Sequence, residues 1–176
     1  MQYNILWQYF EIAINKAMFR TIVDILLSGV ISYDINTVLK TIVRSKYITF
    51  TEINGMMQKS TYGVNDSANK PVPIKDLRRF SLSGTAAQKL CLLRTLPYVI
   101  GHKVPEKSKV WKILVLCNEI CDICLAPAIE EDQLPYLADR IEEHNDLYAE
   151  FSKTFPPKFH YLVHYPTMIR KYGPVR

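Results

Sequence analysis

Apolar residues recur at steps of three and four positions along most of this chain, which is the period of an amphipathic α-helix. The pattern predicts helices over residues 4–30, 34–46, 86–100, 108–125 and 130–155, and a short one from Thr51. Alternation typical of a strand is confined to residues 47–51. We therefore expect an all-α protein, a single irregular bundle of about six to eight helices.

Glycine, proline and capping residues predict where these helices begin and end. Gly29 is expected to stop the first helical stretch, and Asp34 to cap the N-terminus of the next. Residues 62–75 are rich in Gly, Asn, Asp, Ser and Pro, so they predict an internal irregular loop within one helical domain spanning residues 1–176. Pro127 lies just past the expected end of the 108–125 helix, where proline is common.

The composition is that of an ordinary globular domain, with 176 residues, 48% of them hydrophobic and 22% charged. No uninterrupted apolar run approaches the roughly 20 residues of a membrane span, and the N-terminus lacks the pattern of a secretory signal. We expect a soluble intracellular protein of the nucleus or cytoplasm, with reduced cysteines. A net charge of +5 and a pI near 9.0 permit non-specific attraction to nucleic acid but are mild for a dedicated DNA-binding protein.

Three cysteines, Cys117, Cys121 and Cys124, have the C-x3-C-x2-C spacing by which some radical enzymes hold an iron–sulfur cluster. Such a cluster needs its cysteines on a loop, whereas these recur within an apolar helical stripe. Free cysteine packs as a small hydrophobic side chain, so the expected role of all three is structural, with no cofactor and no metal.

His160 and His164 lie four residues apart, a spacing that places two imidazoles on one helical face where they could share a metal ion. Further candidate ligands could reach them only through the tertiary fold, and these are Cys91, His102, Cys117 and His144. The aromatic neighbours of the pair suit packing equally well. We expect structural histidines, with metal ligation and nucleic-acid contact as the alternatives.

Basic and aromatic residues are mixed near the C-terminal end, a combination that can contact phosphates and stack on bases. The candidate nucleic-acid-binding residues are Lys158, Arg170, Lys171 and Arg176, which lie among Phe159, Tyr161, Tyr165 and Tyr172. A solvated helix with a buried aromatic stripe has the same pattern. The acids at positions 130–132 and 142–143 are expected to cap and solvate a helix.

Three blocks of the sequence resemble one known family. They are PKFHYLVHYPTMIRKYGP at residues 157–174, QKLCLLRTLP at residues 88–97, and Tyr62-Gly63 followed by Asp66 and Asn69-Lys70-Pro71. In order and spacing these blocks are similar to those of transposases from CACTA-type (En/Spm-like) DNA transposons and the animal proteins derived from them. The similarity extends over roughly residues 20–176.

The resemblance implies a part of a larger enzyme. In that family an RNase H-like core uses three carboxylates to hold two metal ions, and a large helical insertion precedes the third. The best counterpart of the family's DxMHDLLEGV-like stretch is residues 21–30, with Thr21, Asp24 and Ser28 in place of the expected Asp, His and Glu. The chain stops at Arg176, before the segment that resembles the source of the last acid, so it corresponds to the helical insertion and no catalytic residue is assigned.

The sequence thus predicts a non-enzymatic, transposase-derived helical module for weak, non-specific DNA binding or for protein assembly. No membrane and no small-molecule substrate is expected. No Walker-type loop, dinucleotide fingerprint, GxSxG elbow or HExxH helix is present, which removes support from several enzyme classes. The alternatives are a decayed transposon fragment without selected activity and, more remotely, a Cys/His metal-binding protein.

Overall fold

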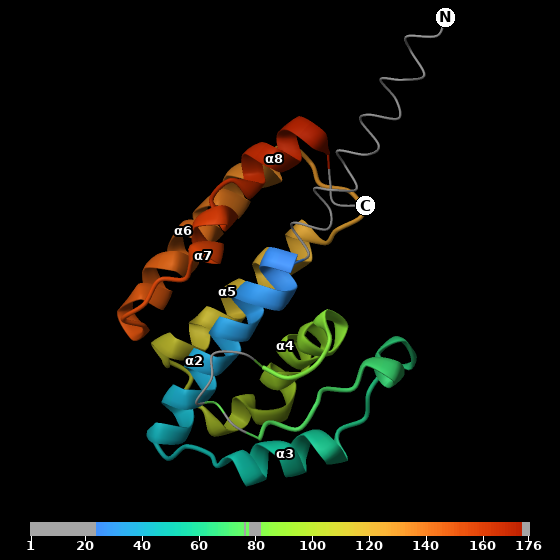
Figure 1. Ribbon diagram of the computed structural model, residues 1–176, viewed down its shortest axis with the longest axis vertical. Coiled ribbons are helices and arrows are strands. Elements are labelled where there is room, and N and C mark those ends of the chain that lie inside the picture. The colour runs from blue at the N-terminus through green and yellow to red at the C-terminus, as the bar shows by residue number, and fades with distance from the viewer. Residues whose placement is uncertain (1–23, 76, 78–81, 174–176) are drawn as a thin grey trace, which may run out of the picture.

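The computed structural model describes residues 24–75, 77 and 82–173, and within these ranges it contains seven α-helices and no strand (Figure 1). The helices are α2 (Ile31–Arg44), α3 (Phe50–Lys59), α4 (Ala86–Ile100), α5 (Lys109–Cys124), α6 (Gln133–Phe151), α7 (Pro157–Leu162) and α8 (Tyr165–Tyr172). Three short helical turns are η1 (Asp24–Val30), η2 (Val64–Asn69) and η3 (Gly101–Lys103). The predicted all-α class and number of helices are confirmed; most of the helix predicted over residues 4–30 lies outside the described residues.

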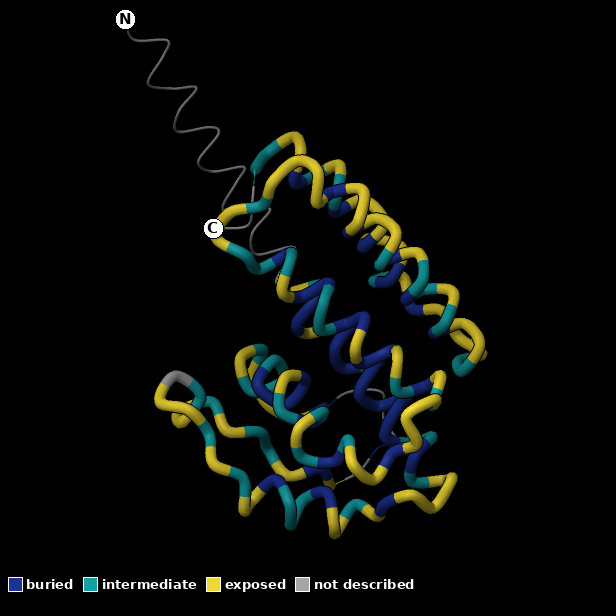
Figure 2. Tube along the Cα trace, turned by 180° about the vertical axis from the view of Figure 1, so that it is seen from behind, coloured by how far each residue is buried: buried dark blue, intermediate teal, exposed yellow. Residues whose placement is uncertain are grey.

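Helices α2 and α5 run side by side through the middle of the molecule (Figure 1). Helix α6, with α8 against it, covers one side of this pair, and α3 and α4 lie on the other. Every α-helix contributes to one apolar core, whose members include Leu39, Leu93, Ile113 and Leu137. Figure 2 shows buried residues concentrated along α2 and α5 and exposed residues along the outer faces of α3 and α6.

The first described helix differs from the sequence prediction at two residues. Gly29 does not end it, because η1 and α2 follow one another without a break. A Cβ at Gly29 would lie 2.1 Å from the Cδ of Lys158, so the glycine instead lets this side chain of α7 pack closely on η1. Asp34 is not an N-cap, because the helix begins before it and its side chain is fully buried inside the bundle.

The segment Asp24–Arg44 has the length and hydropathy of a membrane span, with 21 residues and a mean hydropathy of 1.2. In this structure 72% of its apolar window is buried inside the protein. Its apolar surface is therefore already covered, as the surface of a core helix in a bundle is.

Capping boxes begin α3 and α4. The Thr49 hydroxyl accepts a hydrogen bond from the Glu52 N–H, and the Glu52 carboxylate accepts one from the Thr49 N–H. Thr85 and Gln88 form the equivalent box at α4, which spans the residues that its apolar period predicts. The short alternating run at residues 47–51 forms no strand, because its last two residues belong to the first turn of α3, which begins one residue before the short helix predicted from Thr51.

The segment predicted as a loop, residues 62–75, contains the turn η2 and otherwise has no regular structure. Asn54 ties it to α3, because its Nδ2 donates to the Ile74 carbonyl at 2.9 Å and its Oδ1 accepts from the Ile74 N–H at 2.8 Å. One side-chain amide thus satisfies both polar groups of a residue that has no regular backbone partner. The loop is held against α3 rather than free of it.

Candidate functional site

Three side chains able to bind a metal or a proton meet in the core between α2, α5 and α6. Asp34, Cys117 and His144 are all buried, and their ligand atoms lie within 4.8 Å of one another. His144 Nε2 lies 2.9 Å from Asp34 Oδ2, and neither side chain is exposed. In the part of the chain that the structure describes, no other three His, Cys, Asp or Glu side chains converge this closely. We call this group the Asp–Cys–His cluster.

The imidazole of His144 is fixed on several sides. Its Nδ1 lies 3.3 Å from the Oδ1 of Asn145, and the Asn145 amide donates to the Phe159 carbonyl at 3.4 Å. The Phe159 ring stacks on the imidazole with centroids 5.5 Å apart and an interplanar angle of 17°. These contacts determine which ring nitrogen faces Asp34.

Burial and charge act in opposite directions on His144. Burial lowers the pKa of His144, but the charge of Asp34 and the hydrogen bonds to Asp34 and Asn145 outweigh it and raise the pKa overall. The pKa of the Cys117 thiol is raised well above its ordinary value by a hydrogen bond with Cys121, by burial and by the Asp34 charge. Without a bound ion, the cluster is a hydrogen-bonded histidine–aspartate pair beside a thiol whose deprotonation is disfavoured.

The cluster has the residue types of a cysteine nucleophile with its histidine base, but not their arrangement. In such a relay the thiol lies at one imidazole nitrogen and the orienting group at the other. Here Nε2 of His144 faces Asp34 and Nδ1 faces Asn145, so neither nitrogen is left for Cys117. The cluster is also buried, so it can link three helices or hold an ion but presents no nucleophile to solvent.

Sequence reasoning missed this cluster. Asp34 and His144 are 110 positions apart, and each has an ordinary explanation within its own helix. One signal was available: Asp34 lies within the apolar period formed by Ile31, Ile35 and Val38, where an ionisable side chain needs a buried partner.

The cysteines predicted to pack within a helix do so. All four are free and buried, and Cys117, Cys121 and Cys124 lie on the buried face of α5, as predicted, while Cys91 lies on α4. Their positions confirm the predicted placement of this C-x3-C-x2-C spacing within an apolar helical stripe.

His160 and His164 lie close together but do not belong to one helix. Their rings are 5.1 Å apart and nearly perpendicular, and α7 ends at Leu162, so His164 lies at the N-cap of α8. Both side chains are exposed. No third ligand joins them among the residues that the structure places, which leaves a two-ligand surface pair.

Two of the basic residues predicted to contact nucleic acid lie at the end of α8 and already have neighbours. The Arg170 Nε is 3.3 Å from a carboxylate oxygen of Glu131, at the acidic start of α6. The Lys171 ammonium lies 5.0 Å from the centroid of the Tyr172 ring. An acidic neighbour reduces the attraction of this end of the molecule for a phosphate.

Of the other two, one is described by the structure. Lys158, on α7, is half-buried with its aliphatic chain over Gly29, and its charge lies close enough to that of Lys89 to lower the pKa of Lys89, to which burial is the larger contribution. Arg176 lies outside the described residues. The three described residues of the predicted set therefore have different surroundings, and their role in nucleic-acid binding stays a prediction.

Acidic and basic residues are segregated in the molecule. Residues 119–150 contain ten acids and a single base, Arg140. Most of these acids lie on α6 or in the turn that precedes it. Six exposed cations surround α3 instead, where the described acids are Glu52 and Asp66. None of the six has a described carboxylate within ion-pair distance, although Lys103 lies close enough to Glu52 to lower the pKa of that carboxyl, to which its hydrogen bonds with Thr49 contribute more. They are Arg44, Lys46, Lys59, Lys70, Lys75 and Lys103. We call these six residues the basic surface. Helices α3 and α6 lie on opposite sides of the α2–α5 pair (Figure 1).

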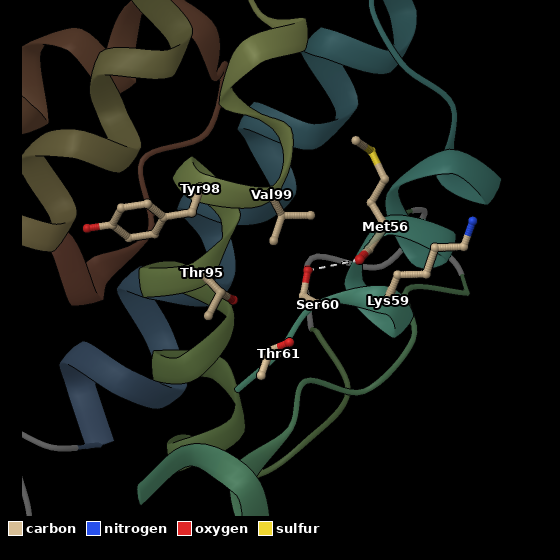
Figure 3. Close-up of a pocket in the computed structure, with 7 residues that line it drawn as sticks. All are labelled: Met56, Lys59, Ser60, Thr61, Thr95, Tyr98 and Val99. Carbon is tan, nitrogen blue, oxygen red and sulfur yellow. Dashed lines mark hydrogen bonds between the residues drawn. The ribbon is translucent and has the colours of Figure 1, made fainter. Parts of the chain in front are cut away.

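An open groove of about 510 Å³ lies between α3 and α4, beside the basic surface. Figure 3 shows Thr95 and Val99 of α4 facing Ser60 and Met56, while the Tyr98 ring is turned away from α3. Tyr98 is 89% exposed, the largest exposed fraction of any described aromatic side chain. The groove is therefore a mixed apolar and hydroxyl surface with an unsupported aromatic ring at its rim.

Two further grooves differ in charge. One of about 240 Å³ lies between α3 and the 62–75 loop and includes Lys70 in its lining. The other, of about 590 Å³, follows α6 and is lined mainly by acids, whose charges are partly met by Lys112 and Arg140. A polyanion is attracted to the first and repelled by the second.

Comparisons with protein-family models, with curated proteins and with solved structures found no match to this chain.

Proposed function

We propose that this chain is a non-catalytic helical module that binds nucleic acid weakly, and without sequence selectivity, through the basic surface around α3. The observation that supports this function is the segregation of charge across the fold. Six exposed cations face solvent on one side, whereas the acids of α6 lie on the other. A phosphate backbone is attracted to the first side and repelled from the second, so binding has a preferred face.

Tyr98 extends the proposal to single strands. It is an exposed aromatic ring at the α4 rim of the α3–α4 groove, whose opposite rim carries Lys59 (Figure 3). Base stacking on an exposed aromatic side chain contributes about 1–3 kcal/mol per base and tolerates any sequence. A duplex keeps its bases stacked on one another, so Tyr98 favours single-stranded over double-stranded nucleic acid.

The resemblance to CACTA-type transposases points in the same direction, because those proteins act on DNA. The basic surface includes Lys70, which belongs to the NKP block of that resemblance. The C-terminal cations have a secondary role in this proposal, because Arg170 is already paired with Glu131. The buried Asp–Cys–His cluster is closed to a substrate in solvent, so the proposal assigns it no catalytic role.

Salt-dependent binding tests the proposal. Fluorescence anisotropy with a labelled single strand and a duplex is measured at low and moderate salt. If about three or four lysines contact phosphates, the log–log slope for the duplex is about −3 to −4. Neutralising Lys59, Lys70 and Lys103 to Gln should remove most of this slope, since each contact contributes about 0.9. The matched control neutralises Lys158, Arg170 and Lys171 and should leave the slope nearly unchanged.

Each outcome identifies a different account. If the control variant loses binding and the Lys59/Lys70/Lys103 variant keeps it, the phosphate contacts belong to the C-terminal residues that the sequence predicts. No binding of either nucleic acid at low salt would contradict the function and leave protein assembly, or a fragment without selected activity. Tyr98→Ala should weaken single-strand binding alone, while Tyr136→Ala, on the acidic helix α6, should have no effect.

A further inference from the structure

Asp34 has a carboxylate oxygen that the protein leaves unsatisfied. Its Oδ2 pairs with His144, but its Oδ1 is buried and has no nitrogen or oxygen donor among the described residues; the Cys117 thiol, a weak donor, is the remaining hydrogen-bonding neighbour of this carboxylate. A buried oxygen of a charged group without a partner is costly, and in folded proteins such an atom calls for an explanation such as an ion. Oδ1 of Asp34 is therefore still able to bind a cation.

The neighbours of Asp34 are suitable metal ligands. Carboxylate oxygen, thiolate sulfur and imidazole nitrogen are the donors that zinc takes in proteins. In a tetrahedral zinc site, bonds of about 2.0–2.3 Å place the ligand atoms about 3.3–3.8 Å apart. The ligand atoms of Asp34, Cys117 and His144 lie within 4.8 Å of one another, so side-chain shifts of about 1 Å would place them around a single ion.

We propose that Asp34, Cys117 and His144 form a closed structural site for one zinc ion that joins α2, α5 and α6. The Zn–S bond replaces the S–H bond of Cys117, whose proton passes to water. His144 binds through Nε2 as the neutral imidazole with its proton on Nδ1, so that any proton on Nε2 also passes to water, and Asp34 binds as the carboxylate. A zinc ion with one thiolate and one carboxylate has no net charge, which suits a buried site. Cys121 is hydrogen-bonded to Cys117 one helical turn away, so it is a candidate fourth donor, which would keep the site uncharged if it binds as the neutral thiol.

The surroundings of His144 have the form of an outer shell around a metal ligand. In metal sites, the ring nitrogen that does not bind the ion usually donates to a carbonyl, carboxylate or amide oxygen, which fixes the orientation of the ring. Here Nδ1 faces the Asn145 Oδ1 at 3.3 Å, and Asn145 is held by the Phe159 carbonyl. The Phe159 ring covers the face of the imidazole, so the site is closed to substrate, as structural zinc sites are.

The proposed zinc site is independent of the proposed nucleic-acid function. It lies between α2, α5 and α6, whereas the basic surface surrounds α3. Metal binding is expected to stabilise the fold rather than to contact a partner.

Cobalt binding tests the site directly. The full chain is unfolded with chelator and reductant, refolded free of metal, and titrated with Co²⁺. We expect uptake of one equivalent, with a sulfur-to-cobalt charge-transfer band and the visible bands of tetrahedral Co²⁺. One equivalent of Zn²⁺ should displace the cobalt and raise the melting temperature. A correctly folded wild-type chain that takes up no Co²⁺ with a thiolate band would overturn the proposal, whatever the variants do.

Variants assign the ligands. Cys117→Ser should abolish the charge-transfer band, and Asn145→Ala, in the outer shell, should weaken Co²⁺ binding by about 10- to 100-fold. Cys91→Ser should leave the spectrum unchanged. The double variant His160→Gln/His164→Gln should also leave it unchanged, because that exposed pair can bind Co²⁺ only without sulfur. Persistence of the thiolate band in Cys117→Ser would refute the assignment.

Discussion

Replacing His144 by leucine should destabilise the metal-free protein far more than an ordinary core substitution does. The imidazole is fully buried 2.9 Å from Asp34, so the variant leaves the buried Asp34 side chain without its hydrogen-bonding partner. That carboxylate must then take up a proton, which for an ordinary aspartate at pH 7 costs about 4 kcal/mol. The whole stability of a domain is about 5–15 kcal/mol, so this loss is a large part of it.

A second substitution should partly reverse the first. Asp34→Asn in the His144→Leu chain removes the buried charge, and the remaining cost is that of a buried amide without its partner, about 1–3 kcal/mol. The double variant should therefore be more stable than His144→Leu by about 1–3 kcal/mol. Alone, Asp34→Asn should cost about 1.5–3 kcal/mol, because it removes a charged hydrogen bond but keeps the shape of the side chain.

Urea unfolding followed by circular dichroism, with chelator present, measures all three variants against the wild type. Asp146→Asn, an exposed acid two residues after His144, is the matched control and should change the unfolding free energy by less than about 0.5 kcal/mol. A double variant less stable than His144→Leu, or a cost of His144→Leu below about 1 kcal/mol, would refute the argument from a buried charge pair.

The pH dependence of the pair has a definite sign. The pKa of His144 is raised above 6.5, because the charge and hydrogen bonds of Asp34 outweigh the effect of burial. A group with a raised folded-state pKa contributes stability that is fully present below the unfolded value and is lost as pH rises through the folded value. In chelator, the stability difference between wild type and Asp34→Asn should therefore be largest near about pH 6 and shrink toward about pH 9. A difference that grows with pH would contradict it.

Smaller effects are expected at four other positions, each measured by thermal or urea unfolding. Gly55→Ala should stabilise by about 0.5–1 kcal/mol, because the new methyl group meets open space in the middle of α3. Gly29→Ala should show no such gain, because its Cβ would lie 2.1 Å from the Lys158 side chain, and a Lys158→Ala background should restore the gain. Thr85→Ala should cost about 1 kcal/mol through loss of the α4 capping box. Combined with Gly55→Ala, it should leave the stabilisation from that substitution unchanged. Cys124→Ala should cost on the order of 1 kcal/mol through lost buried volume, and a cost near zero would show that the core closes around the cavity.

Much of the fold could be predicted because it depends on neighbours along the chain. Helical periodicity and a Thr–Gln capping box specify α4 locally, so its bounds of 86–100 follow from the sequence. The same reasoning places Cys117, Cys121 and Cys124 on one buried face of α5. At residues 47–51 the alternating run is too short to distinguish a strand from the start of a helix, and α3 begins there at Phe50.

What only the tertiary structure decided depends on contacts between distant segments. Asp34 has the residue type of an N-cap, and Gly29 that of a helix stop, yet one is paired with His144 across the core and the other is a site of close approach for Lys158. The basic surface likewise combines cations from α2, α3, the 62–75 loop and η3, which the linear sequence keeps up to 59 positions apart. Spacing along a helix determines which residues share its buried face, but the packing of one helix against another determines which residue each of them meets.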